Sequence, residues 1–349
     1  MNFRRNWWII AVVFIVVGAI LFGIAWQLGA RGGSIFVDDK GVHTSVNNNT
    51  EVKILIDEKS LGEFTSVEVR TIPESVVFIP SDHYGLEVKT AEKLNPTWSL
   101  SGGKLTVKVN PNPPQVNLGL NLVLEEFYVH VYFPKDAVFD NIEVDTTSGS
   151  IDLSELTAAS LTLGSISGRV TADIVMDGGD VYIDTTSGRI DFIGSGSVNR
   201  AEMNSISGSI NADINDCGEM RLNSTSGSVT AKNSGQTATR LTIDSISGSI
   251  KASGNIWESS RVSSTSGAVE VSGKLEGRTV VDSISGSVKL SVNGALADYD
   301  KCHLESLSGT CRVNGQKYGR EVTMTGSNNT GDTIEVSTTS GSITVDFSE

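Results

Sequence analysis

One long apolar run stands apart from the short alternating segments of the rest of the chain. Residues 7–28 carry no charged side chain, and they are long enough to cross a hydrocarbon core of about 30 Å as a helix. Trp7, Trp8 and Trp26 lie at the two ends of this run, where indole rings favour the headgroup layer. The pattern predicts one transmembrane α-helix with these tryptophans as membrane anchors and the lipid bilayer as a partner.

The residues flanking this run bear on its orientation. A cleaved signal peptide is the main rival interpretation, but its apolar region is usually shorter. Arg4 and Arg5 precede the run, and Arg31 and Lys40 follow it, so the positive charges are nearly balanced. The short tail of residues 1–6 favours a cytoplasmic amino terminus. We therefore expect a single-pass plasma-membrane protein with its carboxyl-terminal domain outside the cytoplasm.

Two further segments precede the repeats. Residues 29–50 are polar and rich in Gly and Asn, which predicts a linker. Residues 51–139 contain short alternating runs, which predict an N-terminal β region that starts a larger β structure. Prolines 111, 113 and 114 interrupt it and predict a loop. The alternating runs are 52–56, 66–70, 105–109 and 128–132.

Residues 140–349 form an obvious repeat that is marked by Ser-Gly pairs. Seven of the nine intervals between successive Ser-Gly pairs are 19–21 residues long. The last two widen to 23 and 32 residues, which predicts loop insertions at 293–300 and 315–330. Self-similarity at this period is typical of solenoid proteins. The ten repeated glycines are Gly149, Gly168, Gly188, Gly208, Gly227, Gly248, Gly267, Gly286, Gly309 and Gly341.

Positions counted from each glycine have constant character. The fifth residue before it is always apolar, the third before is Ser or Thr, and the second after is Ile or Val except at Cys311. This pattern predicts a strand, a corner and a second strand in each unit. Glycine suits the corner because it tolerates positive φ and close approach of the neighbouring unit. The sequence predicts an all-β fold, a parallel β-solenoid (β-helix) of about 20-residue repeats, preceded by the transmembrane helix.

The residue two before each glycine alternates between large and small. The series runs Thr147, Ile166, Thr186, Ile206, Thr225, Ile246, Thr265, Ile284, Leu307 and Thr339. Either each rung has one corner and neighbouring rungs interlock, or each rung is twice as long with two opposite corners. With about 4.8 Å per rung, ten single-corner rungs would span on the order of 48 Å. The last strand, 341–347, is expected to form an exposed edge.

Several strings in this order resemble the putative-adhesin family of bacterial repeat proteins, which is related to the toast-rack domains of envelope-stress proteins. They are FTSVEV at 64–69, VFIPSD at 77–82, LTV at 105–107, VYFPK at 131–135, FDNIEV at 139–144 and the TTSGSI/SISGSI units. The resemblance spans most of residues 62–349. It implies a β-solenoid and a location in the cell envelope, and it carries over no catalytic residues.

Charge and cysteine content narrow the classes of function. A net charge of -14 disfavours nucleic acid as a partner, because binding it requires a Lys/Arg surface. Three cysteines are too few for a disulfide framework and lack metal-ligand spacing. Cys302 and Cys311 flank one corner, so they form either a single bridge or two separate buried thiols. No metal site and no cofactor is expected.

Candidate chemistry lies mainly at the position four before each glycine, which we call the polar ladder. Stacked carboxylates there would offer oxygen ligands to divalent cations or sugars, although a solvated outer face explains the pattern better. Arg169 and Arg189 with Asp191 are interpreted as surface charges rather than catalytic groups. The ladder contains Asp145, Asp184, Asn204, Asn223, Asp244, Asp282 and Glu305, and is broken by Gly164, Ser263 and Ser337.

Trp257 and Tyr299 fall between corners, where protruding loops would let them contact a carbohydrate. The two insertions are further candidates for a partner surface. We interpret the chain as a non-enzymatic structural, adhesin-like or envelope-stress interaction module, with an envelope protein or a cell-wall polysaccharide as its partner. The alternatives are a β-helical polysaccharide-active enzyme, distinguished by convergent carboxylates, and a scaffold that polymerises end to end through unpaired strands.

Overall fold

The computed structural model describes residues 34–38, 41–45, 52–109 and 126–348. The predicted tail, transmembrane helix, tryptophan anchors and proline loop lie outside these residues. No helix within the described ranges is long and apolar enough to span a membrane. The chain divides into two compact units. In the first, β1 (Ser34–Asp38) and β2 (Gly41–Ser45) form an antiparallel hairpin within the segment predicted to be a polar linker.

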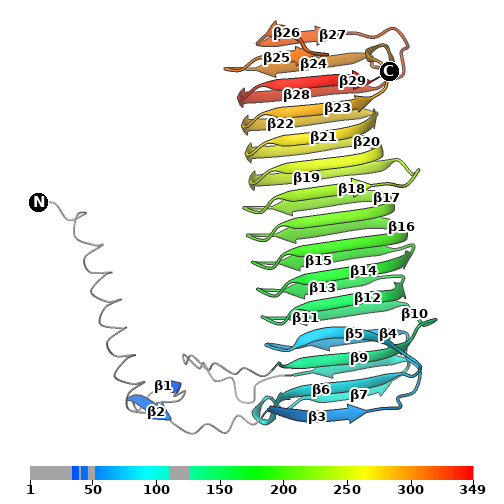
Figure 1. Cartoon of the computed structure of the whole chain (residues 1–349), viewed down its shortest axis with the longest axis vertical. Coiled ribbons are helices and arrows are strands. Elements are labelled where there is room, and N and C mark those ends of the chain that lie inside the picture. The colour runs from blue at the N-terminus through cyan, green and yellow to red at the C-terminus, as the bar shows by residue number, and fades with distance from the viewer. Residues whose placement is uncertain (1–33, 39–40, 46–51, 110–125, 349) are drawn as a thin grey trace, which may run out of the picture. The chain divides into compact units, whose positions relative to one another are not determined.

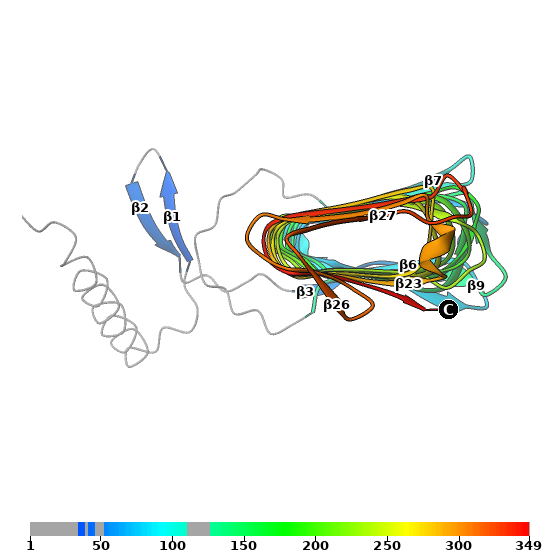
Figure 2. The same ribbon diagram turned by 90° about the horizontal axis from the view of Figure 1, so that it is seen from above.

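The second unit is a parallel β-solenoid with two facing walls of strands (Figure 1, Figure 2). In each rung the chain runs along one wall, turns at a Ser-Gly corner, returns along the other wall and bends into the next rung. Val144 pairs with Leu163, and Leu163 pairs with Ile183, so equivalent residues stack one rung apart. Each rung therefore has one corner, which resolves the question that the sequence left open.

We call the wall that leads into the corner wall A and the wall that leaves it wall B. In stacking order, wall A contains β7 (Thr97–Ser101), β8 (Lys104–Lys108), β4 (Ser66–Arg70), β11 (Asn141–Thr146), β13 (Leu161–Ser165), β15 (Asp180–Thr185), β19 (Thr239–Ser247), β22 (Arg278–Ser285), β28 (Thr333–Ser340), β24 (Lys301–Ser306) and β27 (Glu321–Met324). Three longer strands bend at the far edge and belong to both walls: β16 (Ile190–Ser205), β17 (Ile210–Ser224) and β20 (Ile250–Ser266).

Wall B follows the same stacking order. It contains β3 (Val52–Glu58), β6 (Gly85–Ala91), β9 (Tyr128–Pro134), β5 (Ser75–Ser81), β12 (Ile151–Ala158), β14 (Val170–Asp177), β18 (Val229–Asn233), β21 (Val269–Glu276), β23 (Val288–Asn293), β29 (Ile343–Ser348), β25 (Cys311–Val313) and β26 (Gln316–Gly319). The remaining short elements are β10 (Val138–Phe139), η1 (Glu92–Leu94) and η2 (Leu296–Asp298). All four alternating runs predicted between residues 51 and 139 are strands.

At the carboxyl-terminal end, chain order and stacking order differ. Strand β28 lies between β22 and β24, and β29 lies between β23 and β25, so the last rung in sequence is the penultimate rung in space. The prediction of an exposed C-terminal edge strand is therefore wrong. The segment expected to be a loop insertion at 315–330 instead supplies β26 and β27, which pair antiparallel with β25 and β24 and close this end (Figure 1).

The N-terminal end of the solenoid is closed in a similar way. The first full rung, formed by β4 and β5, pairs with β11 and β12 on one side and with β8 and β9 on the other. Antiparallel pairs then close the end, β7 with β8 and β6 with β9. Antiparallel outer strands interrupt the parallel register that another solenoid would need in order to continue the stack.

The core lies between the two walls. The apolar residues five before and two after each corner glycine are at most 1% exposed, as the alternation along each strand requires. Near the N-terminal end the core widens into an aromatic cluster, in which Phe139 packs against Phe64, Phe78 and Phe133 with ring centres 5.6–6.2 Å apart.

Close approach between rungs explains the corner glycines. A Cβ atom added to Gly227 would lie 1.9 Å from the carbonyl oxygen of Gly208, and one on Gly309 would lie 1.7 Å from that of Gly341. No side chain fits at such distances, whatever the φ angle. The glycines thus form a column that allows successive corners to stack directly on one another.

Gly227→Ala tests this column. The added methyl group must displace the backbone of the neighbouring rung, so we expect the free energy of unfolding to fall by roughly 1–3 kcal/mol or more. Gly62→Ala is the matched control, because its Cβ would meet only Leu100 Cδ2 at 3.6 Å. The measurement is the denaturant midpoint of both variants. Equal midpoints for the two would contradict the close-approach explanation.

Candidate functional site

The residues two before each corner glycine form an exposed row on the outer surface, which we call the ridge. Its isoleucines are 53–56% exposed and Leu307 is 65% exposed, and the threonines between them are also exposed. In stacking order the ridge reads Thr147, Ile166, Thr186, Ile206, Thr225, Ile246, Thr265, Ile284, Thr339 and Leu307. Large and small residues therefore alternate without a break, although the sequence itself places Leu307 directly after Ile284 and before Thr339.

Backbone geometry does not require this alternation. The amide of Ile206 donates to the carbonyl of Thr185 at 3.3 Å, and the amide of Thr225 donates to that of Ser205 at 3.1 Å, so large and small rungs make the same bond. Core packing does not require it either, because more than half of each large side chain is exposed. The size alternation is therefore a property of the outer surface.

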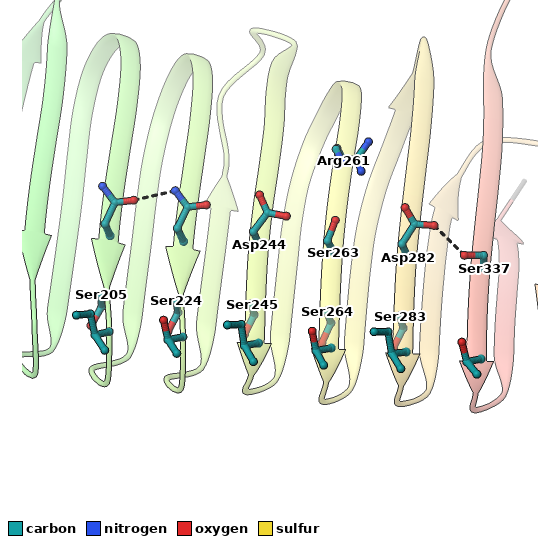
Figure 3. A pocket seen from close by; sticks show the side chains of 18 of the residues that line it. Ser205, Ser224, Asp244, Ser245, Arg261, Ser263, Ser264, Asp282, Ser283 and Ser337 are labelled. Carbon is teal, nitrogen blue, oxygen red and sulfur yellow. Dashed lines mark hydrogen bonds between the residues drawn. The ribbon is translucent and has the colours of Figure 1, made fainter.

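A groove runs beside the ridge along wall A (Figure 3). It has a volume of about 770 Å³ and extends from the rung of Asp184 to the rung of Ser337. The polar ladder lines one side, the ridge lines the other, and the serines between them form the floor. Arg261 adds the one basic side chain of the lining. The groove is thus amphipathic across its width and repeats along its length.

Members of the polar ladder bond to each other rather than converging on one point. Asn223 donates from Nδ2 to Asn204 Oδ1 at 2.7 Å, and Ser337 donates from Oγ to Asp282 Oδ1 at 2.8 Å. Burial raises the pKa of Asp184, and burial together with the Glu143 carboxylate raises that of Asp145. Within the part of the chain that the structure describes, no group of His, Cys, Asp or Glu side chains could hold a metal ion.

The amides of the corner glycines are hydrogen-bonded in two ways, one of which uses the row of hydroxyl residues three before each glycine. In five rungs the glycine amide donates to this hydroxyl, for example Gly168 N to Ser165 Oγ at 2.8 Å and Gly227 N to Ser224 Oγ at 2.9 Å. In the block that begins at Gly248, the amides of Gly248, Gly267 and Gly286 instead donate to the next rung, as from Gly267 to Ser285 O at 3.1 Å. Four buried hydroxyls in that block have no partner: Ser245, Ser264, Ser283 and Thr338.

The expectation that two aromatic residues would contact a ligand is wrong. Trp257 lies in β20 with no exposed surface, and its indole Nε1 donates to Ser272 O at 3.0 Å. Tyr299 is 3% exposed and packs on Phe347 with ring centres 5.5 Å apart, and burial raises its pKa to about 12. The side chain of Trp257 points inward because β20 is bulged near it, whereas Tyr299 directly follows η2 and is not part of a strand.

Other predicted groups are structural or lie on the surface. Arg189 Nε donates to Asp191 Oδ1 at 2.8 Å in an exposed ion pair, as expected from the sequence. Cys302 and Cys311 are two separate buried thiols rather than a disulfide, and Cys217 is also free. Burial raises the pKa of Cys217 and of Cys302 to about 12, so both thiols stay protonated and unreactive at neutral pH.

The sequence contained the alternation that forms the ridge, but it did not show that the alternation is continuous along the solenoid. The Thr/Ile alternation was visible along the chain, yet the chain order of Ile284, Leu307 and Thr339 broke it. Only the position of β28 between β22 and β24 shows that the alternation continues in space. No pattern in the sequence indicated the groove. The polar ladder and the ridge line a single face only if each rung has one corner, and the sequence left that question open.

A comparison with protein families identifies one family that matches this chain. The model of the family described as Toastrack DUF4097 matches residues 64–272 and again 178–346, which together cover most of the chain. No curated protein sequence matches significantly.

Solved bacterial structures also match over most of their length. A protein described as a putative adhesin from Parabacteroides distasonis is 11% identical with a TM-score of 0.44, covering 86% of this chain and 98% of that one. A protein from the same organism described as a putative lipid binding protein is 15% identical with a TM-score of 0.40, covering 87% and 98%. A putative adhesin from Bacteroides fragilis is 11% identical with a TM-score of 0.31, covering 86% and 99%.

Trp257→Ala distinguishes a core residue from a ligand contact. Removing a fully buried indole leaves a cavity, so we expect a loss of about 3–5 kcal/mol in the free energy of unfolding. Tyr318→Ala is the control, because Tyr318 is 37% exposed on β26 and should change stability by no more than about 0.5 kcal/mol. Thermal or denaturant unfolding of both variants measures the difference. Unchanged stability of the Trp257 variant would contradict its role in the core.

Proposed function

The chain belongs to the Toastrack DUF4097 family, and on that premise we propose that it is a non-enzymatic interaction module of the cell envelope. Residues 7–28 anchor it in the plasma membrane, and the solenoid lies on the extracytoplasmic side. The ridge and groove of wall A bind its partner. The anchor and the compartment rest on the sequence pattern alone, whereas the binding surface rests on the geometry of the described residues.

The observation that carries this proposal is the exposure of the ridge. Five large apolar side chains stand in one line along eight rung steps of about 4.8 Å, a length of roughly 38 Å. Scattered apolar residues are normal on a protein surface, but an aligned and regularly spaced set is typical of a binding surface. The adjacent polar ladder supplies hydrogen-bonding groups along the same length.

The mechanism would be geometric. Rungs that stack in register at glycine corners form a stiff support, because each corner rests on the carbonyl of the one before it. Both ends are closed by antiparallel strands, which leaves the long face as the surface available for association. A partner on this face would be held in a fixed register along the rod.

Two alternatives fit this geometry less well. A polysaccharide-active enzyme needs paired carboxyl groups, one of them in apolar surroundings. Along the groove, Asp244 is exposed and Asp282 bonds to Ser337, so neither occupies such surroundings. End-to-end polymerisation needs open parallel edges, whereas the outer strands β7, β26 and β27 pair antiparallel with their inner neighbours.

Crosslinking on intact native cells tests compartment and surface together. A membrane-impermeant, amine-reactive crosslinker can reach partly exposed lysines of wall A such as Lys104 and Lys301, so the wild-type chain should shift to a larger species. The Ile206→Asp/Ile246→Asp variant should lose that shift, because a charge on the ridge disfavours apolar contact. Ile193→Asp is the matched control, since Ile193 is 50% exposed on wall B and should leave the shift intact.

Each unfavourable outcome bears on a different part of the proposal. A shift that appears only after the cells are permeabilised would contradict the extracytoplasmic location. A shift that survives in the ridge variant would contradict the binding surface. Circular dichroism of the purified variants checks that the fold is intact, as expected for substitutions at exposed positions.

A further inference from the structure

We propose that the partner on the ridge is a second copy of this chain, packed antiparallel through a two-fold axis perpendicular to the solenoid. This inference rests on the proposed function, because it names the occupant of the same surface. The axis would pass between the rung of Thr225 and the rung of Ile246, which are the fifth and sixth of the ten stacked corners. Closed two-fold pairing is the commonest form of association between identical chains.

The number of rungs makes the ridge complementary to itself. A two-fold axis at the centre of ten rungs places the first opposite the tenth, the second opposite the ninth, and so on. Because ten is even and the residues alternate, every large side chain then meets a threonine of the second copy. The opposed pairs are Thr147 with Leu307, Ile166 with Thr339, Thr186 with Ile284, Ile206 with Thr265, and Thr225 with Ile246, and each pair occurs twice.

The position of the last rung in the stack preserves the pairing of large with small residues. Without the insertion of β28 between β22 and β24, Leu307 would stack directly on Ile284 and two large residues would be adjacent. The two-fold axis would then oppose Ile166 to Leu307 and Thr147 to Thr339, a large–large and a small–small pair. The observed order instead keeps all five pairs complementary, and neither the backbone bonds nor the core requires it.

The polar ladders oppose one another across the same axis. Asn223 lies opposite Asp244 of the second copy, an arrangement in which the amide donates to the carboxylate. Asp184 lies opposite Asp282 of the second copy, and Asp145 lies opposite Glu305, so like charges weaken the pairing. Salt screens such charges and leaves apolar contact intact. Self-association should therefore become tighter as salt concentration rises.

Size substitutions at the centre of the ridge test the pairing directly. The full-length chain is purified in detergent, and its monomer–dimer equilibrium is measured by sedimentation across a wide range of concentration. Thr225→Ile places two large side chains opposite each other, so the dissociation constant should rise by about tenfold or more. Adding Ile246→Thr exchanges large and small within the same opposed pair, so the double variant should recover tight pairing.

The double variant also separates this arrangement from a staggered parallel one. In a parallel pair shifted by one rung, the new side chain at position 225 would meet Ile206 of the second copy, and the exchange would not restore the fit. Rescue by the double variant is thus specific to the antiparallel axis. Failure of rescue, with the fold intact by circular dichroism, would overturn the proposed arrangement.

Disulfide trapping gives an independent readout of register. A chain with Thr186→Cys is mixed with a differently tagged chain carrying Ile284→Cys, and the two should form a mixed disulfide on mild oxidation. Thr186→Cys mixed with itself should not, because these positions lie five rungs apart in the antiparallel pair. Background from the native thiols is low, since Cys217, Cys302 and Cys311 are all buried.

The outcomes separate this inference from the proposed function. If the purified chain stays monomeric at every concentration while the crosslinked species on cells still depends on the ridge, another molecule occupies the surface and self-pairing is overturned. If the self-mixed Thr186→Cys chains crosslink instead of the opposed pair, the copies are parallel and the inference is also overturned. Loss of both signals would reject the binding surface itself.

Discussion

The close stacking of corner glycines is the constraint on which the rest of the structure depends. Each corner rests on the carbonyl of the corner before it, at a distance that excludes any Cβ atom. Once the corners are stacked in this way, every position counted from the glycine becomes a row along the solenoid. One row is the core, one is the buried hydroxyls, one is the polar ladder and one is the ridge. A periodic sequence thereby becomes a patterned surface.

The two ends show how the chain stops this stacking. At each end antiparallel strands pair with the outermost parallel rung, and the first or last full rung in the chain lies one place inward of that rung. This arrangement covers edges that would otherwise invite further strands. It also changes the order of rungs, so that Thr339 separates Ile284 from Leu307. The placement of this one rung therefore serves both the capping of the core and the regularity of the ridge.

Sequence reasoning predicted the parts of the fold that follow from periodicity. The apolar row five before glycine, from Val144 to Leu304, and the strand–corner–strand unit could be predicted because their spacing is constant. It failed at the last strand, where Gly341 to Phe347 carries an ordinary repeat motif that says nothing about which rung it joins. It also failed at Trp257, because a bulge in β20 reverses the inward and outward alternation that marks a side chain as exposed.

The measurement that tests this account most directly is intramolecular disulfide formation between ridge positions. The account places position 339 one rung from position 284, within the roughly 4.4–6.8 Å between Cα atoms that a disulfide spans, and places position 307 two rungs away. The Ile284→Cys/Thr339→Cys chain should therefore oxidise to a closed monomer, and the Ile284→Cys/Leu307→Cys chain should not. A bridge in the second chain and none in the first would contradict the threaded order of rungs and the alternating ridge.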